Sequence, residues 1–202
     1  MPRALYLSSV AFMFGLSAPA VLGHYALLQF DGRGASSADY KQPFAQILTD
    51  YMFRCATRNA SQRWHKYVRS HTRERRRPIY LYHFTQRSNH TGPESCRGLA
   101  CHMSELPFVF NRSERGVVSP GQFSADEVGL TNAVMSYWIS FARHGHPNER
   151  QVLRGVPSER PYWPSWSPEV PAQLQMEWPP RLAGTDTCDA TCGFWDQLGY
   201  RF

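Results

Sequence analysis

Residues 79–102 of this chain read IYLYHFTQRSNHTGPESCRGLACH, and this stretch decides the fold that we expect. Its first six residues are aliphatic and aromatic and follow Pro78, so they have the length and composition of a buried strand in a parallel sheet. The residues from Asn89 to Cys101 include glycine, proline and two cysteines without periodicity, which predicts an irregular loop at the carboxyl end of that strand. Loops at this edge of an open α/β sheet carry the chemistry in such folds, so the loop is where we look for functional residues.

Two amphipathic helices accompany this strand. Between Pro43 and Asn59, apolar residues recur every three or four positions, as on a helix with one buried face. Ser124 and Glu127 form a capping-box pattern, and the apolar positions that follow continue to Gly145, a residue suited to end a helix. The sequence therefore predicts an α/β class with a parallel sheet and several helices.

After Pro147 the composition turns to proline, tryptophan and serine. Prolines break helices and remove backbone donors, so we predict a long ordered loop or short edge strands there. Trp163, Trp166 and Trp178 are expected to anchor this loop to the body of the protein rather than to bind a ligand.

The 202-residue chain has 42% hydrophobic residues, enough for one domain with a sizeable core. Its net charge of +6 would permit binding to phosphate or to an anionic membrane surface. The densest basic run, His71–Arg77, precedes the strand and lacks the interleaved aromatic residues of a nucleic-acid groove. We therefore predict a solvated loop and no nucleic-acid partner, with binding through Arg73–Arg77 left as the alternative.

The first 20 residues allow two interpretations. Arg3, the apolar stretch Ala4–Leu16 and the small residues of Ala18–Ala20 match a signal peptide with its cleavage site, so residues 1–20 are predicted to be a leader. The alternative is that Met1 is not the true start and that this stretch lies inside a longer protein. No other apolar run approaches the roughly 20 residues that cross a membrane, so no membrane span is expected.

Three Asn-x-Ser/Thr sequons, at Asn59, Asn89 and Asn111, lie in polar stretches, as a glycosylated surface requires. Together with the five cysteines they favour an oxidising compartment and a secreted protein.

The cysteines also allow a competing interpretation, a zinc site. Its ligands would be Cys96, Cys101, Cys188 and either Cys192 or His102. Neither cysteine pair has the usual two-residue spacing of a zinc finger, so no metal is expected.

Three separated stretches resemble the C-terminal third of type-B carboxylesterases and cholinesterases. Residues 48–58, LTDYMFRCATR, are similar to the family's T-D-Y-x-F-x-C-P-x-R stretch. Residues 96–110, CRGLACHMSELPFVF, resemble C-H-G-x-E-L-P-F-V-F. Residues 137–148, YWISFARHGHPN, followed by the Trp-Pro pair at 163–164, resemble W-x-x-F-A-x-x-G-x-P-N…W-P. The order and spacing of the three stretches match as well.

The resemblance covers residues 21–202 and implies an incomplete C-terminal part of an α/β-hydrolase fold. His102 falls on the family's catalytic histidine, which takes a proton from a serine hydroxyl and returns it to the leaving alcohol. Met103 stands where the family has glycine, so its side chain would crowd a position that needs a positive φ. Glu105 matches an acidic residue that we expect to be a structural partner rather than the triad acid.

The resemblance also implies two disulfides. One joins Cys55 to Cys192, the other joins Cys96 to Cys101, and Cys188 is left over. A long-range bridge of the first kind contributes about 3 to 5 kcal/mol by restricting the unfolded chain.

The sequence contains no G-x-S-x-G nucleophile elbow. Residues 15–19, GLSAP, begin like one but have Pro19 where the second glycine belongs. By resemblance, the triad acid and the oxyanion loop would lie further upstream of Asp50 than this chain extends. We therefore expect a fragment that needs no cofactor, is inactive alone, and acts on a small ester only when completed by a missing N-terminal part. The alternative is a non-catalytic extracellular binding or adhesion module with a protein partner.

Overall fold

The structure, a computed structural model, describes residues 1–28, 39–71, 78–88, 96–111, 123–149, 160–183 and 189–200. The chain divides into two compact units. The first combines Met1–Tyr67 with Thr187–Phe202, and the second spans Val68–Asp186.

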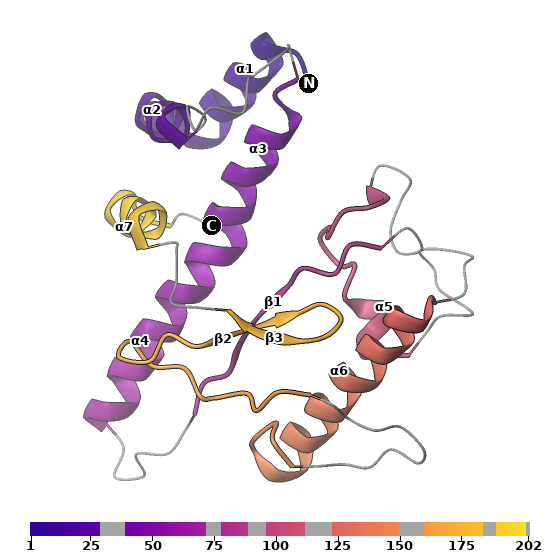
Figure 1. The fold of residues 1–202 in the computed structure, drawn as a ribbon. Coiled ribbons are helices and arrows are strands. Elements are labelled where there is room, and N and C mark those ends of the chain that lie inside the picture. The colour runs from indigo at the N-terminus through magenta and orange to yellow at the C-terminus, as the bar shows by residue number, and fades with distance from the viewer. Residues whose placement is uncertain are drawn as a thin grey trace. The chain divides into compact units, whose positions relative to one another are not determined.

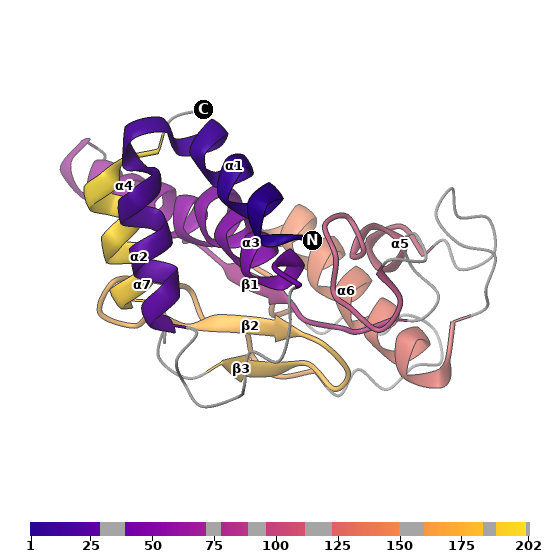
Figure 2. The ribbon, with the colours of Figure 1, turned by 90° about the horizontal axis from the view of Figure 1, so that it is seen from above.

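The first unit is helical in its described residues. Helix α1 (Arg3–Phe14) ends at Gly15, whose φ of 52° is a backbone conformation that glycine adopts without strain. The single 3-10 turn η1 (Gly15–Ser17) then leads into α2 (Ala18–Leu28), and Figure 2 shows the bend between the two helices.

Residues 1–20, predicted to be a leader, contribute to the core of this unit. Tyr6 and Val10 are buried, and the ring centroid of Phe14 lies 5.1 Å from that of Tyr51 and 5.4 Å from that of Trp195. The helical stretch Arg3–Ala26 is also long and apolar enough to cross a membrane, which signal sequences and core helices share. The leader stays a prediction, and so does the alternative of an internal segment.

Three helical segments follow one another as one long rod: α3 (Lys41–Leu48), the π-helical turn η2 (Thr49–Arg54) and α4 (Cys55–His71) (Figure 1). The helix predicted between Pro43 and Asn59 is confirmed, but the observed rod is longer at both ends.

The extension of α4 to His71 escaped the sequence analysis for a physical reason. Beyond Asn59 this helix is mostly polar, and its buried positions there are Ser61 and Val68, seven residues apart. The polar composition of this stretch, rather than a lack of helical periodicity, is why the sequence prediction ended at Asn59.

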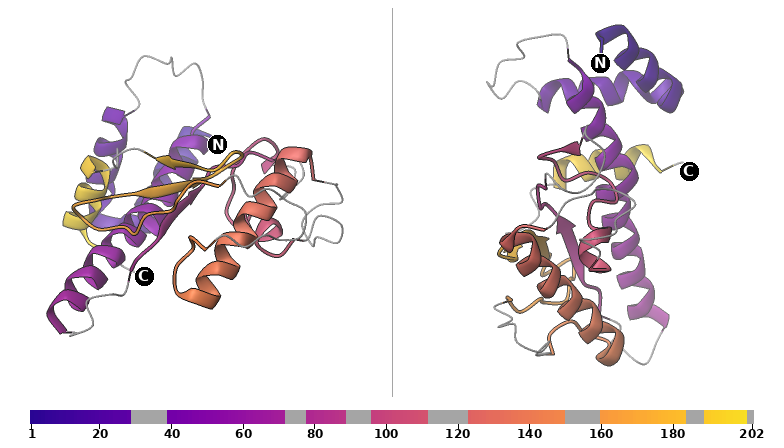
Figure 3. Two further views of the ribbon diagram at one scale, coloured as in Figure 1. Left: turned by 60° about the horizontal axis from the view of Figure 1, so that its bottom comes forward. Right: turned by 90° about the vertical axis from the view of Figure 1, so that its right-hand side faces the viewer.

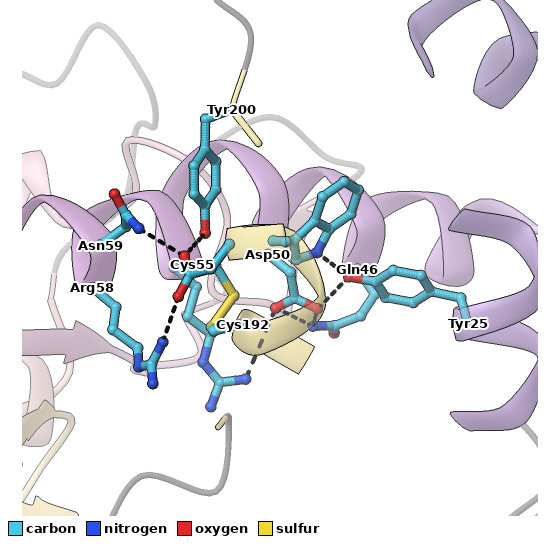
Figure 4. The surroundings of a disulfide bond; sticks show 11 residues. Tyr25, Gln46, Asp50, Cys55, Arg58, Asn59, Cys192 and Tyr200 are labelled. Atoms are coloured by element: carbon cyan, nitrogen blue, oxygen red, sulfur yellow. Dashed lines mark hydrogen bonds and ion pairs between the residues drawn. A yellow bond between two sulfur atoms is a disulfide. The ribbon is translucent and has the colours of Figure 1, made fainter. Parts of the chain in front are cut away.

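Asp50, on the π-helical turn, is the buried polar centre of the first unit. The Tyr25 hydroxyl donates to its Oδ2 at 2.9 Å, and Gln46 Nε2 donates to both carboxylate oxygens at 2.9 Å (Figure 4). Trp195 Nε1 in turn donates to the Tyr25 hydroxyl at 2.9 Å. Because a buried carboxylate needs such partners, this network fixes α2, the long rod and α7 (Asp189–Leu198) to one another.

A disulfide joins the same elements covalently. Cys55 and Cys192 are both fully buried and are bonded, as the resemblance implies (Figure 4). Beside the bridge, the Asp196 carboxylate accepts hydrogen bonds from Arg58 Nη1 at 3.1 Å and from Asn59 Nδ2 at 2.8 Å. Reducing this bridge would remove a constraint across 137 residues.

The second unit contains a three-stranded mixed sheet in the order β1-β2-β3 (Figure 3). β1 (Leu81–Phe84) pairs in parallel with β2 (Gln173–Met176), and β2 pairs antiparallel with β3 (Arg181–Ala183). Leu174 and Met176 on β2 are buried while Gln173 and Gln175, which alternate with them, are partly exposed, as in a strand with one face on a core.

The predicted strand at Ile79–Phe84 is confirmed as β1 with a later start, since Ile79 forms only an isolated bridge with Trp166. The prediction that it is buried is wrong. In the described residues β1 lies at the edge of the sheet, and Tyr82 is 41% exposed.

Helix α6 (Ala125–His144) begins and ends as predicted. The Ser124 hydroxyl accepts from the Glu127 N–H at 3.3 Å, the Glu127 carboxylate accepts from the Ser124 N–H at 2.8 Å, and Gly145 ends the helix with a φ of 73°. Leu130, Val134 and Tyr137 of α6 share one buried cluster with Leu174 and Met176 of β2. The helix therefore covers a face of the sheet.

The three tryptophans of the proline-rich region anchor it, as predicted. Trp163 and Trp166 are buried, and the Trp166 N–H donates to the Ile79 carbonyl at 2.7 Å. Trp178 packs on Gly129, where an added Cβ would lie 2.6 Å from the indole. The region forms irregular segments and two short strands, of which β3 lies at an edge of the sheet as the prolines predict, whereas β2 pairs on both sides and is central.

Replacing Phe14 by alanine is predicted to lower the free energy of unfolding by about 2 kcal/mol, because its ring packs on Tyr51 and Trp195. Phe12, on the same helix but 92% exposed, is the matched control, and Phe12→Ala should change stability by less than about 0.5 kcal/mol. Urea titration followed by circular dichroism measures both. Equal effects would contradict the packing of α1 into the first unit.

Candidate functional site

His102 lies on a tight turn that directly follows a disulfide-closed loop. Cys96 is bonded to Cys101, with 5.9 Å between their Cα atoms, the second pairing that the resemblance implies. The Ser104 N–H and hydroxyl both donate to the Cys101 carbonyl, at 3.1 and 2.7 Å. His102 is exposed between these two constraints, so the turn presents its imidazole at the surface of the described part of the second unit.

Hydrogen bonds tether this turn to α6. The Gly98 N–H donates to the Ser88 carbonyl at 2.9 Å, and Ser88 also forms an isolated bridge with Leu99. The Ser88 hydroxyl donates to Oε1 of Glu127, whose other oxygen caps α6 through Ser124. One buried carboxylate thus begins the helix and holds the segment that leads to His102.

The sequence analysis found the capping role of Glu127 but missed its bond to Ser88. The two residues are 39 positions apart, and no spacing rule links them.

Met103, which stands where the resembled family has a glycine, has a φ of 70°. The family's glycine would adopt this conformation freely, whereas a residue with a Cβ is strained there by about 1 to 2 kcal/mol. The Met103 side chain is 52% exposed, so the strain lies in the backbone rather than in crowding by neighbours.

Residues 105–110 anchor the turn to the core on its other side. The Glu105 carbonyl accepts from the N–H groups of Phe108 and Val109 at 3.0 and 3.1 Å, which begins the one-turn helix α5 (Leu106–Val109). Phe108 is fully buried and stacks on Phe123 with 4.9 Å between ring centroids.

Burial, and after it the negative charge of Glu105, raises the pKa of the Tyr82 phenol.

Within the described residues, no group of three or more histidine, cysteine or acidic residues is placed to hold a metal ion. Cys96, Cys101 and Cys192 are all in disulfides, so they cannot serve as the thiolate ligands of the alternative zinc site. Cys188 lies outside the described residues, as does the basic run from Arg73 to Arg77.

The structure distinguishes two of the three sequons. Asn111 is exposed at the end of α5, with a φ of 49°. Asn59 lies within α4, and its Nδ2, the atom that a glycan would modify, donates to Asp196. Asn89 lies outside the described residues.

The sequence of this chain matches the carboxylesterase family over residues 17–195. The chain belongs to the carboxylesterase family. It is 27% identical over 197 residues to the crystal protein of Dictyostelium discoideum, a match that covers 96% of this chain and 32% of that protein. It is 28% identical to the acetylcholinesterase of Gallus gallus, with 91% and 21% covered, and 30% identical to the acylcarnitine hydrolase of Mus musculus, with 60% and 18% covered. The chain thus spans about a third or less of the length of these relatives.

Family membership confirms the resemblance recognised in the sequence and implies an α/β-hydrolase. The second unit of this carboxylesterase-family chain, with its parallel β1-β2 pair and the covering helix α6, is consistent with part of such a fold.

Met103→Gly is predicted to raise the free energy of unfolding by about 1 kcal/mol, because glycine relieves the strain at a φ of 70°. Met103→Ala is the control, since it shortens the side chain but keeps the Cβ, and it should change stability by less than about 0.5 kcal/mol. Denaturant titration of the three proteins measures the difference. Equal stability of the glycine and alanine variants would show that the backbone conformation at this position is not strained.

Proposed function

We propose that this chain is the histidine-bearing part of a carboxylic-ester hydrolase and that His102 is its general base. The observation that carries the proposal is the exposed turn of His102, in a chain that belongs to the carboxylesterase family and whose residues 96–110 resemble the family's histidine segment. An imidazole with a pKa near neutrality both accepts and returns a proton at physiological pH, as ester hydrolysis by a serine requires.

The restraints around the turn support this role. A general base must be held within hydrogen-bond reach of the hydroxyl that it deprotonates, so its backbone must be rigid. The Cys96–Cys101 bridge closes the loop directly before the turn, the Ser88–Glu127 bond ties the preceding segment to α6, and Phe108 anchors the following one in the core.

The other catalytic groups are proposed to come from outside this sequence, because it contains no G-x-S-x-G elbow. A lone imidazole supplies general-base assistance of about a hundred-fold to ten-thousand-fold, without a covalent route or an oxyanion hole. Hydrolysis by this chain alone is therefore expected to be negligible. The substrate is proposed to be a small carboxylic ester.

The test places residues 17–202 in an active carboxylesterase in exchange for the matching C-terminal segment. With a short-chain aryl ester, His102→Ala in this chimera is predicted to lower kcat/KM by about 1000-fold or more, because the serine loses its base. His144→Ala, which removes another exposed histidine of the second unit, should leave the rate within about twofold. Hydrolysis that is unaffected by His102→Ala would reject the catalytic role.

A second candidate function, a non-catalytic extracellular binding module, is favoured by the positive φ of Met103 and by the absence of a serine elbow from this sequence. The chimera described above distinguishes the two candidate functions. A folded chimera that stays inactive even with Met103→Gly, together with saturable binding of a protein partner by the full chain, would favour the binding module. Activity restored by Met103→Gly would favour the hydrolase.

We also propose that the protein is secreted and glycosylated at Asn111. Two disulfides support an oxidising compartment, and the exposed amide of Asn111 suits a glycan better than the hydrogen-bonded amide of Asn59. After expression through a eukaryotic secretory pathway, Asn111→Gln is predicted to lower the mass by one glycan, and Asn59→Gln to leave the mass of the glycans unchanged. Mass spectrometry decides between them, and loss of a glycan with Asn59→Gln alone would contradict the assignment.

A further inference from the structure

The second unit contains a cavity of about 230 Å³ that the proposed function does not use. Its lining consists of six aromatic side chains and Pro147: Tyr80, Tyr82, Tyr137, Trp138, Phe141 and Trp163. Trp163 is the hub, since its ring centroid lies 5.9 Å from that of Tyr80 and 5.3 Å from that of Tyr137, both in edge-to-face geometry. The walls are therefore apolar and mutually packed.

Hydrogen bonds fix Trp163 independently of any ligand. Its Nε1 donates to the Leu81 carbonyl at 3.1 Å. Its backbone N–H donates to Asn148 Oδ1 at 2.7 Å, and its carbonyl accepts from Asn148 Nδ2 at 2.8 Å. Such preorganised walls lower the entropy lost on binding.

One side of the cavity is open to solvent. Trp163 is only 4% exposed, whereas Tyr82 and Phe141 are 41% and 49% exposed. Trp163 is therefore a buried part of the lining, whereas Tyr82 and Phe141 are solvent-exposed parts of it.

Among the described residues, no side chain that lines the cavity is ionised at neutral pH. Burial raises the pKa of Tyr80, Tyr82 and Tyr137, so their phenols stay neutral. The Arg160 guanidinium carbon lies 4.4 Å from the ring centroid of Tyr137. Arg160 therefore already makes a cation–π interaction with that ring. Glu105 acts on Tyr82 through space but does not line the cavity. A second cation would meet repulsion from Arg160 and no lining carboxylate.

We propose that this cavity is a binding site for a small neutral apolar molecule or group, an aryl ring or a short branched alkyl chain, which gives Trp163 a ligand-binding role beside the anchoring role expected from the sequence. The size is sufficient, because apolar cavities of about 150 Å³ in other proteins take up benzene. The proposal is independent of the role proposed for His102, since none of the lining residues belongs to the turn of that histidine.

The experiment uses the full chain and an isosteric pair of probes, tert-butylbenzene and phenyltrimethylammonium, which differ only in the charge of the branched centre. The neutral probe is expected to bind saturably with a Kd on the order of 0.1 mM or tighter, and at least about tenfold more tightly than the cation. Ligand-observed NMR measures both affinities. Failure of the neutral probe to bind, or equal or tighter binding of the cation, would overturn the proposal.

Two variants locate the site. Phe141→Ala removes part of the wall and is expected to weaken binding of tert-butylbenzene by about tenfold. Phe110→Ala removes a phenylalanine that is 66% exposed and does not line the cavity, and it should change the affinity by less than about twofold. Circular dichroism confirms that both variants are folded. Equal weakening by the two substitutions, or no weakening by Phe141→Ala, would place binding elsewhere and refute the assignment.

Discussion

The packing of the second unit depends on the indole of Trp163, which is held in one position. Trp163 is buried among the aromatic residues of α6 and β1, and its ring N–H is bonded to the backbone of β1. Asn148, just beyond α6, holds its backbone through two reciprocal hydrogen bonds. The family motif that ends in P-N and continues with W-P is therefore a structural clamp: it joins the end of a helix to a strand and leaves an aromatic cavity beside the joint.

Each unit also contains a buried carboxylate that is satisfied from distant parts of the sequence. Asp50 accepts hydrogen bonds from Tyr25 and Gln46 in the first unit, and Glu127 accepts from Ser88 and Ser124 in the second. A buried carboxylate without partners is strongly destabilising, so these bonds specify which segments meet. In the second unit this specification reaches the candidate site, because the Ser88 carbonyl accepts from Gly98 in the disulfide-closed loop that directly precedes His102.

The turn of His102 keeps supports suited to the family's catalytic histidine but departs from the family's motif at the next residue. Its disulfide, its tether to α6 and the anchor at Phe108 are the supports that a proton-transferring imidazole needs. Met103 in the left-handed region is the opposite, a strained backbone at the position after the histidine. Belonging to the carboxylesterase family settles the fold class of this chain, while its chemistry depends on whether a nucleophile meets this turn.

The sequence by itself predicted the features that depend on residues close together in the chain. The capping box of α6, its glycine end, strand β1 and the family motifs are short-range patterns, and each was read from neighbouring residues. The tertiary structure alone decided the edge position of β1 among the described strands, the bond from Ser88 to Glu127 and the aromatic cavity. These features arise where segments far apart in the chain meet. Periodicity and spacing along the sequence do not show which segments pack together or where a cavity remains between them.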